Sequence, residues 1–248
     1  MKILILDIET APHKVYAWGL HDQHLSINQI VEPGYTMCWA AKWLGRPEVM
    51  FGSVHRHGSR KMARSVHKLL DEADAVVHFN GKNFDVPTLN KEFLLHSLPP
   101  PAPFKHVDLL WACRQLFKFA SNKLDYLAQA LGEGAKVEHK GMDLWRGCMN
   151  GDEASWRTME RYNRHDVRLT ERLYNRLLPW LPQHPNHGQF HEGEGAVCPR
   201  CGSDKLQRRG VYRAAVYTYH RLKCVSCGAW SRGRLSDPTY PKPQLVAA

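Results

Sequence analysis

Two carboxylates stand directly after an apolar stretch at the start of the chain. Residues 3–6 are continuously apolar, which is typical of a strand buried on both faces, and Asp7 and Glu9 follow at once. Side chains two residues apart on an extended chain point to the same face, so both acids would converge on one spot. Burying such charges costs several kcal/mol each unless a cation neutralises them. The pattern predicts a metal site, and two solvated acids before a turn at residues 10–12 are the alternative.

Two further acids lie where predicted elements would present them. Asp85 follows an apolar strand predicted at residues 74–80 and opens a predicted helix, a position where active-site carboxylates often emerge from α/β sheets. Asp166 lies on a long helix predicted over residues 153–178. Tyr162 precedes it by four residues and therefore lies on the same helix face. Asp108 is predicted to cap the helix that follows it.

Four of the seven cysteines form two CxxC pairs, and each pair is followed by a glycine that allows a tight turn. The four are Cys198, Cys201, Cys224 and Cys227. Thiolates at this spacing are the ligand set of tetrahedral zinc, and redox-active pairs are the alternative. Strand-forming residues between the pairs predict a zinc ribbon that one structural Zn²⁺ helps to fold. The isolated cysteines are predicted to be buried thiols: Cys38, Cys113 and Cys148.

The charge of the chain favours a polyanionic partner. The formal net charge is +10 and the isoelectric point is about 9.3. Residues 197–235 carry nine basic residues and one acid, so most of the excess lies there. Aromatic rings alternate with these cations, which is typical of single-strand nucleic-acid binding. The predicted contacts are Arg213, Arg221, Trp230, Arg232 and Arg234. A solvated ribbon face, or a surface that recruits a protein partner, is the alternative.

The elements that would position these residues indicate an α/β fold with a mixed sheet. Strands are predicted near residues 35–45 and 48–53, and helices at 60–73, 86–98 and 123–132. The stretch 181–196 has prolines, glycines and no apolar periodicity, and this composition indicates a linker. We predict a large domain over residues 1–182, a linker over 183–196, a ribbon over 197–235 and a tail over 236–248. Linker histidines are expected to be solvated (His184, His187 and His191), and His55 and His57 to lie in a loop.

Composition excludes several classes of protein. No apolar run approaches the roughly 18 residues that span a bilayer, so no membrane partner is expected. The N-terminus lacks the pattern of a secretory signal. An odd number of cysteines argues against a secreted disulfide scaffold and favours a reducing, cytoplasmic location.

The acidic motifs follow one another as an ordered set: Asp7-x-Glu9, Asn80-x-x-x-Phe84-Asp85 and Tyr162-x-x-x-Asp166. This set resembles the DEDD, or DnaQ-like, superfamily of 3′–5′ exonucleases and extends over most of residues 1–175. The resemblance implies a ribonuclease-H-like fold and the removal of nucleotides from 3′ ends of DNA or RNA. The histidine branch of the family carries its histidine where Arg161 stands here, so the tyrosine branch is the better match.

The resemblance also implies roles for these residues. Two Mg²⁺ or Mn²⁺ ions would bind at the acids, because oxygen ligands suit these ions. Asp7 would bridge both ions, Glu9 and Asp166 would complete one site, and Asp85 would support the other. Tyr162 would orient the attacking water, and Asn80 and Phe84 would contact the nucleic acid.

The sequence leaves three hypotheses open. The first is a metal-dependent 3′–5′ exonuclease that acts on single strands, with DNA as the expected substrate. The second is an endonuclease or RNA-processing nuclease on the same fold, since architecture does not determine where a strand is cut. The third is a catalytically silent nucleic-acid-binding protein, which is disfavoured because all four acids and the tyrosine are present. No residue can be assigned to reading a 2′-hydroxyl.

Overall fold

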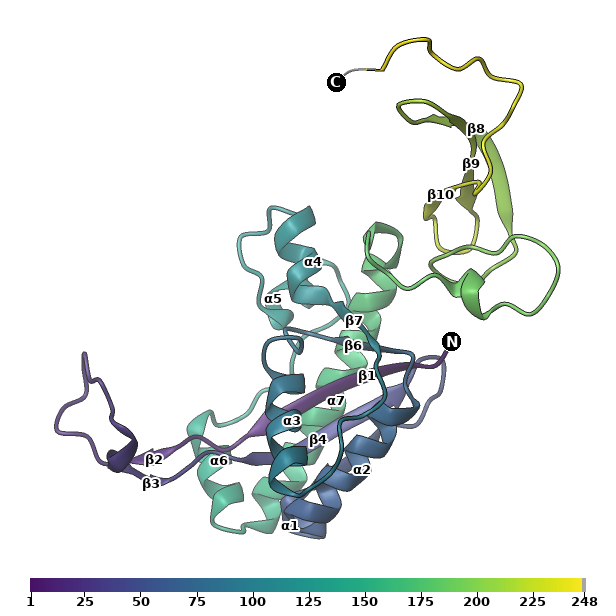
Figure 1. The fold of residues 1–248 in the computed structure, drawn as a ribbon. Coiled ribbons are helices and arrows are strands. Elements are labelled where there is room, and N and C mark those ends of the chain that lie inside the picture. The colour runs from purple at the N-terminus through teal and green to yellow at the C-terminus, as the bar shows by residue number, and fades with distance from the viewer. Residues whose placement is uncertain (247–248) are drawn as a thin grey trace. The chain divides into compact units, whose positions relative to one another are not determined.

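The central strand of the larger sheet is β1 (Ile3–Thr10), in which apolar side chains alternate between two covered faces. The computed structural model describes residues 1–246. On one side β1 pairs antiparallel with β4 (Thr36–Trp43), which pairs antiparallel with β5 (Met50–Ser53). On the other side it pairs parallel with β6 (Ala75–His78), which pairs parallel with β7 (Lys105–Asp108). The sheet order is β5-β4-β1-β6-β7 (Figure 1), and the predicted mixed α/β fold is confirmed.

The parallel pairing of β1, β6 and β7 brings their carboxyl ends to one edge of the sheet. Asp7 and Glu9 lie at the end of β1, and Asp108 ends β7. The turn after β6 leads into Asp85 at the start of α3 (Asp85–Leu95). Acids that are far apart in the chain therefore meet at this edge.

The two faces of β1 are covered by different helices. Leu4, Leu6 and Ile8 pack in a core with residues of α2 (Ser59–Glu72) and α3. Each fully buried leucine contributes about 1.5–3 kcal/mol, so this face holds the strand in place. The opposite face, which carries the acids, lies toward α7 (Glu153–Leu177). A second core, which includes Met159 and Tyr162 of α7, joins it to α6 (Met142–Met149).

The remaining elements include some that the sequence did not predict. Between β1 and β4 the chain forms β2 (Lys14–Val15), a short 3₁₀ turn and β3 (Ile30–Glu32). Helices α4 (Leu109–Leu116) and α5 (Leu124–Ala130) follow β7.

None of the helices described between residues 1 and 246 has the length and apolar character needed to cross a membrane.

Capping by side chains explains one confirmed prediction and one error. Asp108 accepts hydrogen bonds from the N–H groups of Leu110 and Trp111, so it caps α4 as predicted. His55 and His57 were predicted in a loop, but they lie in α1 (Val54–His57). The Ser53 side chain caps that helix by accepting from the N–H of Arg56, a local signal that the apolar pattern does not carry. The isolated cysteines are buried, as predicted: Cys38, Cys113 and Cys148.

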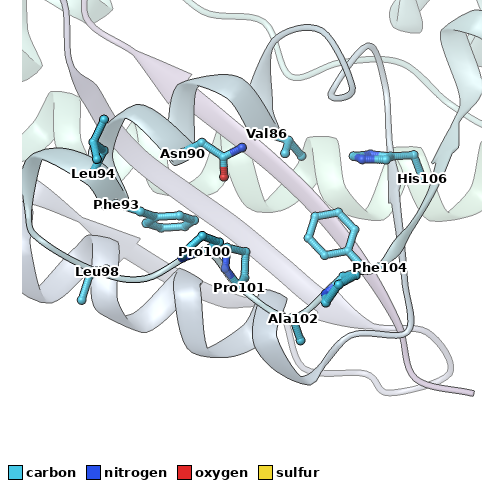
Figure 2. A pocket seen from close by; sticks show the side chains of 11 residues that line it. Val86, Asn90, Phe93, Leu94, Leu98, Pro100, Pro101, Ala102, Phe104 and His106 are labelled. Atoms are coloured by element: carbon cyan, nitrogen blue, oxygen red, sulfur yellow. The ribbon is translucent and has the colours of Figure 1, made fainter.

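A proline run at residues 99–101 connects α3 to β7. Helix α3 ends at Leu95, earlier than predicted, because Ser97 has a left-handed φ of 55° and the Leu98 N–H donates to the Phe93 carbonyl at 2.9 Å, which caps the helix. This segment, α3 and Phe104 enclose a largely apolar cavity of about 510 Å³ (Figure 2). No residue predicted for chemistry or binding lines it, so it is separate from the site described below.

The chain divides into two compact units, residues 2–173 and the part from Tyr174 onward together with Met1. In the second unit, β8 (Leu206–Arg213), β9 (Thr218–Cys224) and β10 (Trp230–Arg232) form an antiparallel sheet. The domain and linker boundaries predicted from composition stay a prediction. The last two residues of the predicted tail, 247 and 248, lie outside the described residues.

The prediction that the linker histidines are solvated is wrong for His184. This side chain is buried, its Nε2 lies 2.7 Å from the Tyr174 hydroxyl, and its ring stacks on His187. Burial lowers the pKa of His184 to about 4, so it is neutral at pH 7. Composition alone could not show this, because the partner that buries the ring lies on the preceding helix.

Candidate active site

Three acids converge where β1 meets α7. One carboxylate oxygen from each of Asp7, Glu9 and Asp166 lies within 4.8 Å of the others. Asp7 and Glu9 share a face of β1 because they are two residues apart. Asn163 of α7 donates from Nδ2 to Asp7 Oδ2 at 2.7 Å, which fixes the orientation of that carboxylate. The structure thus brings together three of the four predicted acids.

The crowding of these acids favours their protonated forms. Loss of hydration, followed by repulsion from Glu9 and Asp85, holds the pKa of Asp7 well above its usual range. Burial raises the pKa of Glu9 to about 8. Burial likewise raises the pKa of Asp166, although a nearby lysine opposes this. A site that disfavours its own ionised form calls for more positive charge than the protein supplies.

Asp85 lies beside this group but is held differently. Its side chain is buried, and its Oδ1 accepts the backbone N–H of Ile8 at 3.1 Å. Burial raises the pKa of Asp85 to about 6, while nearby His78 and the N–H of Ile8 act in the opposite direction. Among the described residues, the group whose carboxylate oxygens lie within 4.8 Å of one another consists of Asp7, Glu9 and Asp166 and does not include Asp85.

Lys136, like Asn163, is a residue of this site that the sequence did not predict. Its Nζ lies 2.5 Å from Asp166 Oδ2 and 2.9 Å from the Tyr162 hydroxyl. Burial acts to lower the pKa of Lys136, but the neighbouring Asp166 and Tyr162 outweigh it and raise the pKa above its usual value. Lys136 therefore places a permanent positive charge among the acids.

Long-range contacts position the loop that carries Lys136. The backbone N–H of Lys136 donates to Asp125 Oδ1 at 2.7 Å, and the carbonyl of Ala135 lies 2.7 Å from His165 Nε2. His165, next to Asp166 in sequence, thus contacts this loop instead of joining the acids. The loop has no apolar periodicity, so no signal in the sequence could have found Lys136.

Tyr162 is buried with its hydroxyl at the acid cluster. Its ring packs edge-on against His139 and Trp145. Burial, then the charges of Asp166 and Glu9, raise the pKa of Tyr162 above its usual value. Its hydroxyl is therefore protonated at neutral pH and cannot act as a base.

The donor set fits divalent metal ions. All of the converging ligand atoms are carboxylate oxygens, which suit Mg²⁺ or Mn²⁺ better than zinc. Asp166 Oδ1 is buried without a hydrogen-bond partner, an arrangement that costs free energy unless a cation occupies its lone pairs. Asp7, Glu9 and Asp166 could therefore hold a metal ion.

A cavity of about 620 Å³ opens beside the acids, between β1, the turn after β6, α4 and α5. Asn80, whose φ of 71° lies in the left-handed region, lines it with Phe79. Three cations also line it: Arg114, Lys123 and Lys136. Phe84 is exposed at the start of α3 and does not line this cavity. The size of this cavity and its mixture of cations with apolar groups suit a nucleotide.

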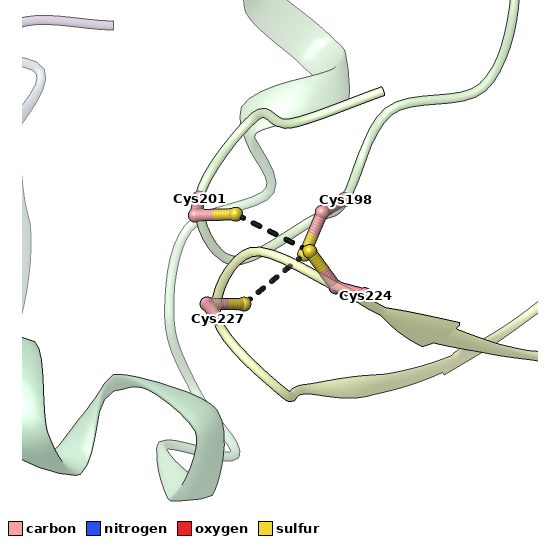
Figure 3. Close-up of side chains that lie close together, drawn as sticks. All are labelled: Cys198, Cys201, Cys224 and Cys227. Atoms are coloured by element: carbon pink, nitrogen blue, oxygen red, sulfur yellow. Dashed lines mark hydrogen bonds between the residues drawn. The ribbon is translucent and has the colours of Figure 1, made fainter. Parts of the chain in front are cut away.

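The four CxxC cysteines also converge, as Figure 3 shows. Sγ–Sγ distances are 3.7 Å for Cys198–Cys227 and 3.6 Å for Cys201–Cys224. A zinc tetrahedron with Zn–S bonds of about 2.3 Å has S–S separations of about 3.8 Å, whereas a disulfide would be about 2 Å. Gly202 and Gly228 have φ of 74° and 80°, which only glycine adopts freely, so both tight turns depend on them.

Most of the predicted nucleic-acid contacts of this second unit take part in cation–π contacts within the unit. The Arg221 guanidinium lies 4.8 Å from the Trp230 ring centre, and that of Arg232 lies 4.1 Å from the Tyr219 ring centre. Arg213 lies 6.0 Å from the ring of Tyr240. Arg234 is exposed. By the strand register, Tyr219, Arg221, Trp230 and Arg232 share one face of the sheet, whereas Arg213 lies on the other. The role of these residues in binding stays a prediction.

Comparison with known proteins gives a family. The RNase H superfamily matches residues 47–178, more than half of the chain. The crystal structure of RNase D from Trypanosoma brucei is similar, with a TM-score of 0.46 and 16% sequence identity over 73% of this chain. This chain spans 57% of the length of that protein. No curated protein sequence matches this chain.

The acid cluster predicts a pH-dependent affinity for Mg²⁺. Glu9, with a pKa of about 8, must lose its proton before it binds a cation. Affinity should therefore rise by about tenfold per pH unit for each displaced proton between about pH 6 and pH 8 and then level off. Calorimetric titration in several buffers measures both the affinity and the protons released. An affinity that does not change over this range would contradict the raised pKa.

The cysteine geometry predicts that a chelator unfolds only the segment that carries the cysteines, residues 197–235. Its buried core consists largely of the cysteines themselves, with Ala229 and Leu206, and such a core is too small to fold without a metal. Excess chelator should abolish near-ultraviolet signals from Trp230 and release about one zinc per chain, while the first unit keeps its melting transition. Cys113→Ala is the control, since that buried thiol lies apart from the cluster. Full retention of structure without zinc would refute the prediction.

Proposed function

This chain belongs to the RNase H superfamily, and we propose that it is a metal-dependent 3′–5′ exonuclease of the DEDD group, tyrosine branch. Its substrate would be the phosphodiester bond at the 3′ end of a single strand. The observation that carries the proposal is the convergence of Asp7, Glu9 and Asp166 with the Tyr162 hydroxyl at one edge of the sheet. Superfamily membership supports a nuclease in general.

Two Mg²⁺ or Mn²⁺ ions would bind at the carboxylates. Asp7, Glu9 and Asp166 offer the converging oxygens, and Asp85 lies close enough to Asp7 to raise its pKa. Asp85 would therefore support the second ion directly or through water. When bound, such ions lower the pKa of an attacking water and stabilise the charge that develops on the phosphate.

The protein groups then have distinct tasks. Tyr162, which keeps its proton, would orient the attacking water by a hydrogen bond rather than remove its proton. Lys136 would supply a fixed positive charge beside the reacting phosphate. Asn163 keeps the Asp7 carboxylate in its binding orientation.

The surroundings of the site support a nucleic-acid substrate. Arg114 and Lys123 in the adjacent cavity could bind phosphate, while Phe79 and Leu110 offer apolar contact for a base or sugar. Asn80 would contact the same nucleotide. In the second unit, a zinc ribbon held by four cysteines would present its basic and aromatic surface to the strand. Recruitment of a protein is the alternative role for that ribbon.

Digestion of end-labelled DNA and RNA strands tests this function. With Mg²⁺, a 5′-labelled strand should shorten stepwise from its 3′ end. Asp166→Asn should lose on the order of a hundredfold or more in rate, because it removes a metal ligand. Asp143→Asn, at an exposed acid on α6, is the control and should keep its rate. Internal cuts would identify an endonuclease, and binding without cleavage would identify a silent protein; either result would contradict the proposal.

Lys136→Met separates catalysis from metal binding. Removing a fixed charge beside the phosphate should lower kcat by on the order of a hundredfold. Affinity for Mg²⁺ should stay the same or rise, because a competing cation leaves Asp166. Lys140→Met, at an exposed position on the same loop, should behave like the unaltered protein. Unchanged kcat in the Lys136 variant would show that the lysine only fills space in the metal-free site.

A further inference from the structure

The segment between β1 and β4 forms an arm that stands out from the sheet (Figure 1). This aromatic arm comprises residues 14–32. Its two short strands, β2 and β3, pair Lys14 with Glu32 and Val15 with Ile30. The backbone N–H of Tyr16 donates to the carbonyl of Gln29 at 2.9 Å, which continues the ribbon toward its tip. The arm thus has a defined backbone but contributes nothing to either core of the sheet.

The side chains of the arm are apolar and exposed to an unusual degree. Trp18 is 98% exposed, Leu20 96%, Ile27 88% and Tyr16 76%. Single exposed apolar residues are normal on a soluble protein, but several on one projecting element mark a binding surface. The packing of the chain itself gives no reason for a tryptophan at this position.

The arm begins and ends beside the acid cluster. It leaves the sheet after Thr10 at the end of β1 and returns to β4 at Thr36, and these two residues are partners in the ladder. Glu9 is the partner of Cys38 in the same ladder. A strand whose 3′ end reached the acids would therefore pass close to the base of the arm.

The charge of the arm indicates which part of a nucleic acid it could contact. Lys14 is its only lysine or arginine, and Lys14 Nζ is paired with Glu32 Oε2 at 2.7 Å. The arm therefore has no free strong cation for phosphate. Aromatic faces stack on bases without needing a charge.

The aromatic rings of the arm differ from those of the second unit. There, Arg221 and Arg232 already cover the rings of Trp230 and Tyr219. Within the part of the chain that the structure describes, no ring or cation stacks on Trp18 or on the Tyr16 ring. The free aromatic faces that lie nearest in sequence to Asp7 and Glu9 are thus those of the arm, and Phe84, beside Asp85, is a further exposed ring.

We propose that the aromatic arm is a stacking platform for unpaired bases, with Tyr16 and Trp18 as its contacts. This inference rests on the proposed nuclease function, since it needs a strand whose 3′ end reaches Asp7 and Glu9. The arm holds bases a few nucleotides upstream of that end, independently of sequence. Phosphates are held elsewhere, by the cations of the cavity and of the second unit.

A cycle of protein and substrate changes tests the platform. Binding of a fluorescent single-stranded DNA of about 12 nucleotides is measured by anisotropy with the full chain carrying Asp166→Asn and without a chelator, so that cleavage is suppressed and the four-cysteine site stays intact. Trp18→Ala should weaken binding on the order of tenfold, and so should abasic sites placed upstream of the 3′ end. Combining both changes should cost no more than either alone, because each removes the same stack.

Controls on the same arm and a salt series complete the test. Ile27→Ala removes an exposed aliphatic side chain and should bind normally. Trp18→Ala should leave the dependence of affinity on salt unchanged, because stacking releases no counterions. At 98% exposure, Trp18 can be removed without affecting folding.

Three results would overturn the proposal. In the first, Trp18→Ala binds DNA as well as the unaltered chain does, or the loss of affinity that it causes adds fully to the loss caused by the abasic sites. In the second, sedimentation shows that Trp18→Ala breaks a self-association without changing DNA affinity, so the arm contacts a second copy of the chain. In the third, the chain binds no DNA or RNA strand, and the proposed function fails as well; in the first two that function stands.

Discussion

Repulsion among carboxylates that share one poorly hydrated spot is the interaction on which the candidate site depends. The end of β1 points Asp7 and Glu9 to the face where α7 brings Asp166. Each of these groups has a raised pKa, so the folded chain holds the site at a cost. Apolar packing of the opposite face of β1 against α2 and α3 offsets this cost. Binding of divalent cations would remove it.

Lys136 partly offsets this repulsion with its positive charge. One ammonium group neutralises part of the charge at Asp166, yet Asp166 Oδ1 remains without a partner. The lysine is held by a loop that Asp125 and His165 anchor, so its position belongs to the tertiary structure. Because it contacts both Asp166 and Tyr162, the same lysine connects the candidate metal ligands to the group proposed to orient water.

Most of the site could be predicted because its residues obey short periods. A spacing of two placed Asp7 and Glu9 on one face of a strand, and a spacing of four placed Tyr162 and Asp166 on one face of a helix. Each CxxC pair was likewise recognised from two cysteines only three residues apart. The central strands and the long helix followed from apolar patterns, although their ends shifted where caps or prolines intervened.

The features that could not be predicted depend on contacts between distant segments. Lys136 lies in a loop without periodicity, and His184 is buried by a tyrosine on another element. The aromatic arm has strands only two and three residues long, too short to leave a pattern. Asp85 was predicted to support the second ion, which stays a prediction; the hydrogen bond from the Ile8 N–H that holds it beside the other acids is a contact between distant segments.

We propose that Asp7, Glu9 and Asp166 form a divalent metal site. Anomalous scattering from a crystal of the chain grown with Mn²⁺ tests it most directly. We predict two manganese peaks roughly 3.5–4 Å apart, with oxygens of these three acids as ligands and Lys136 Nζ withdrawn from Asp166. Absence of manganese at saturating concentration, with the Lys136–Asp166 contact intact, would contradict the claim.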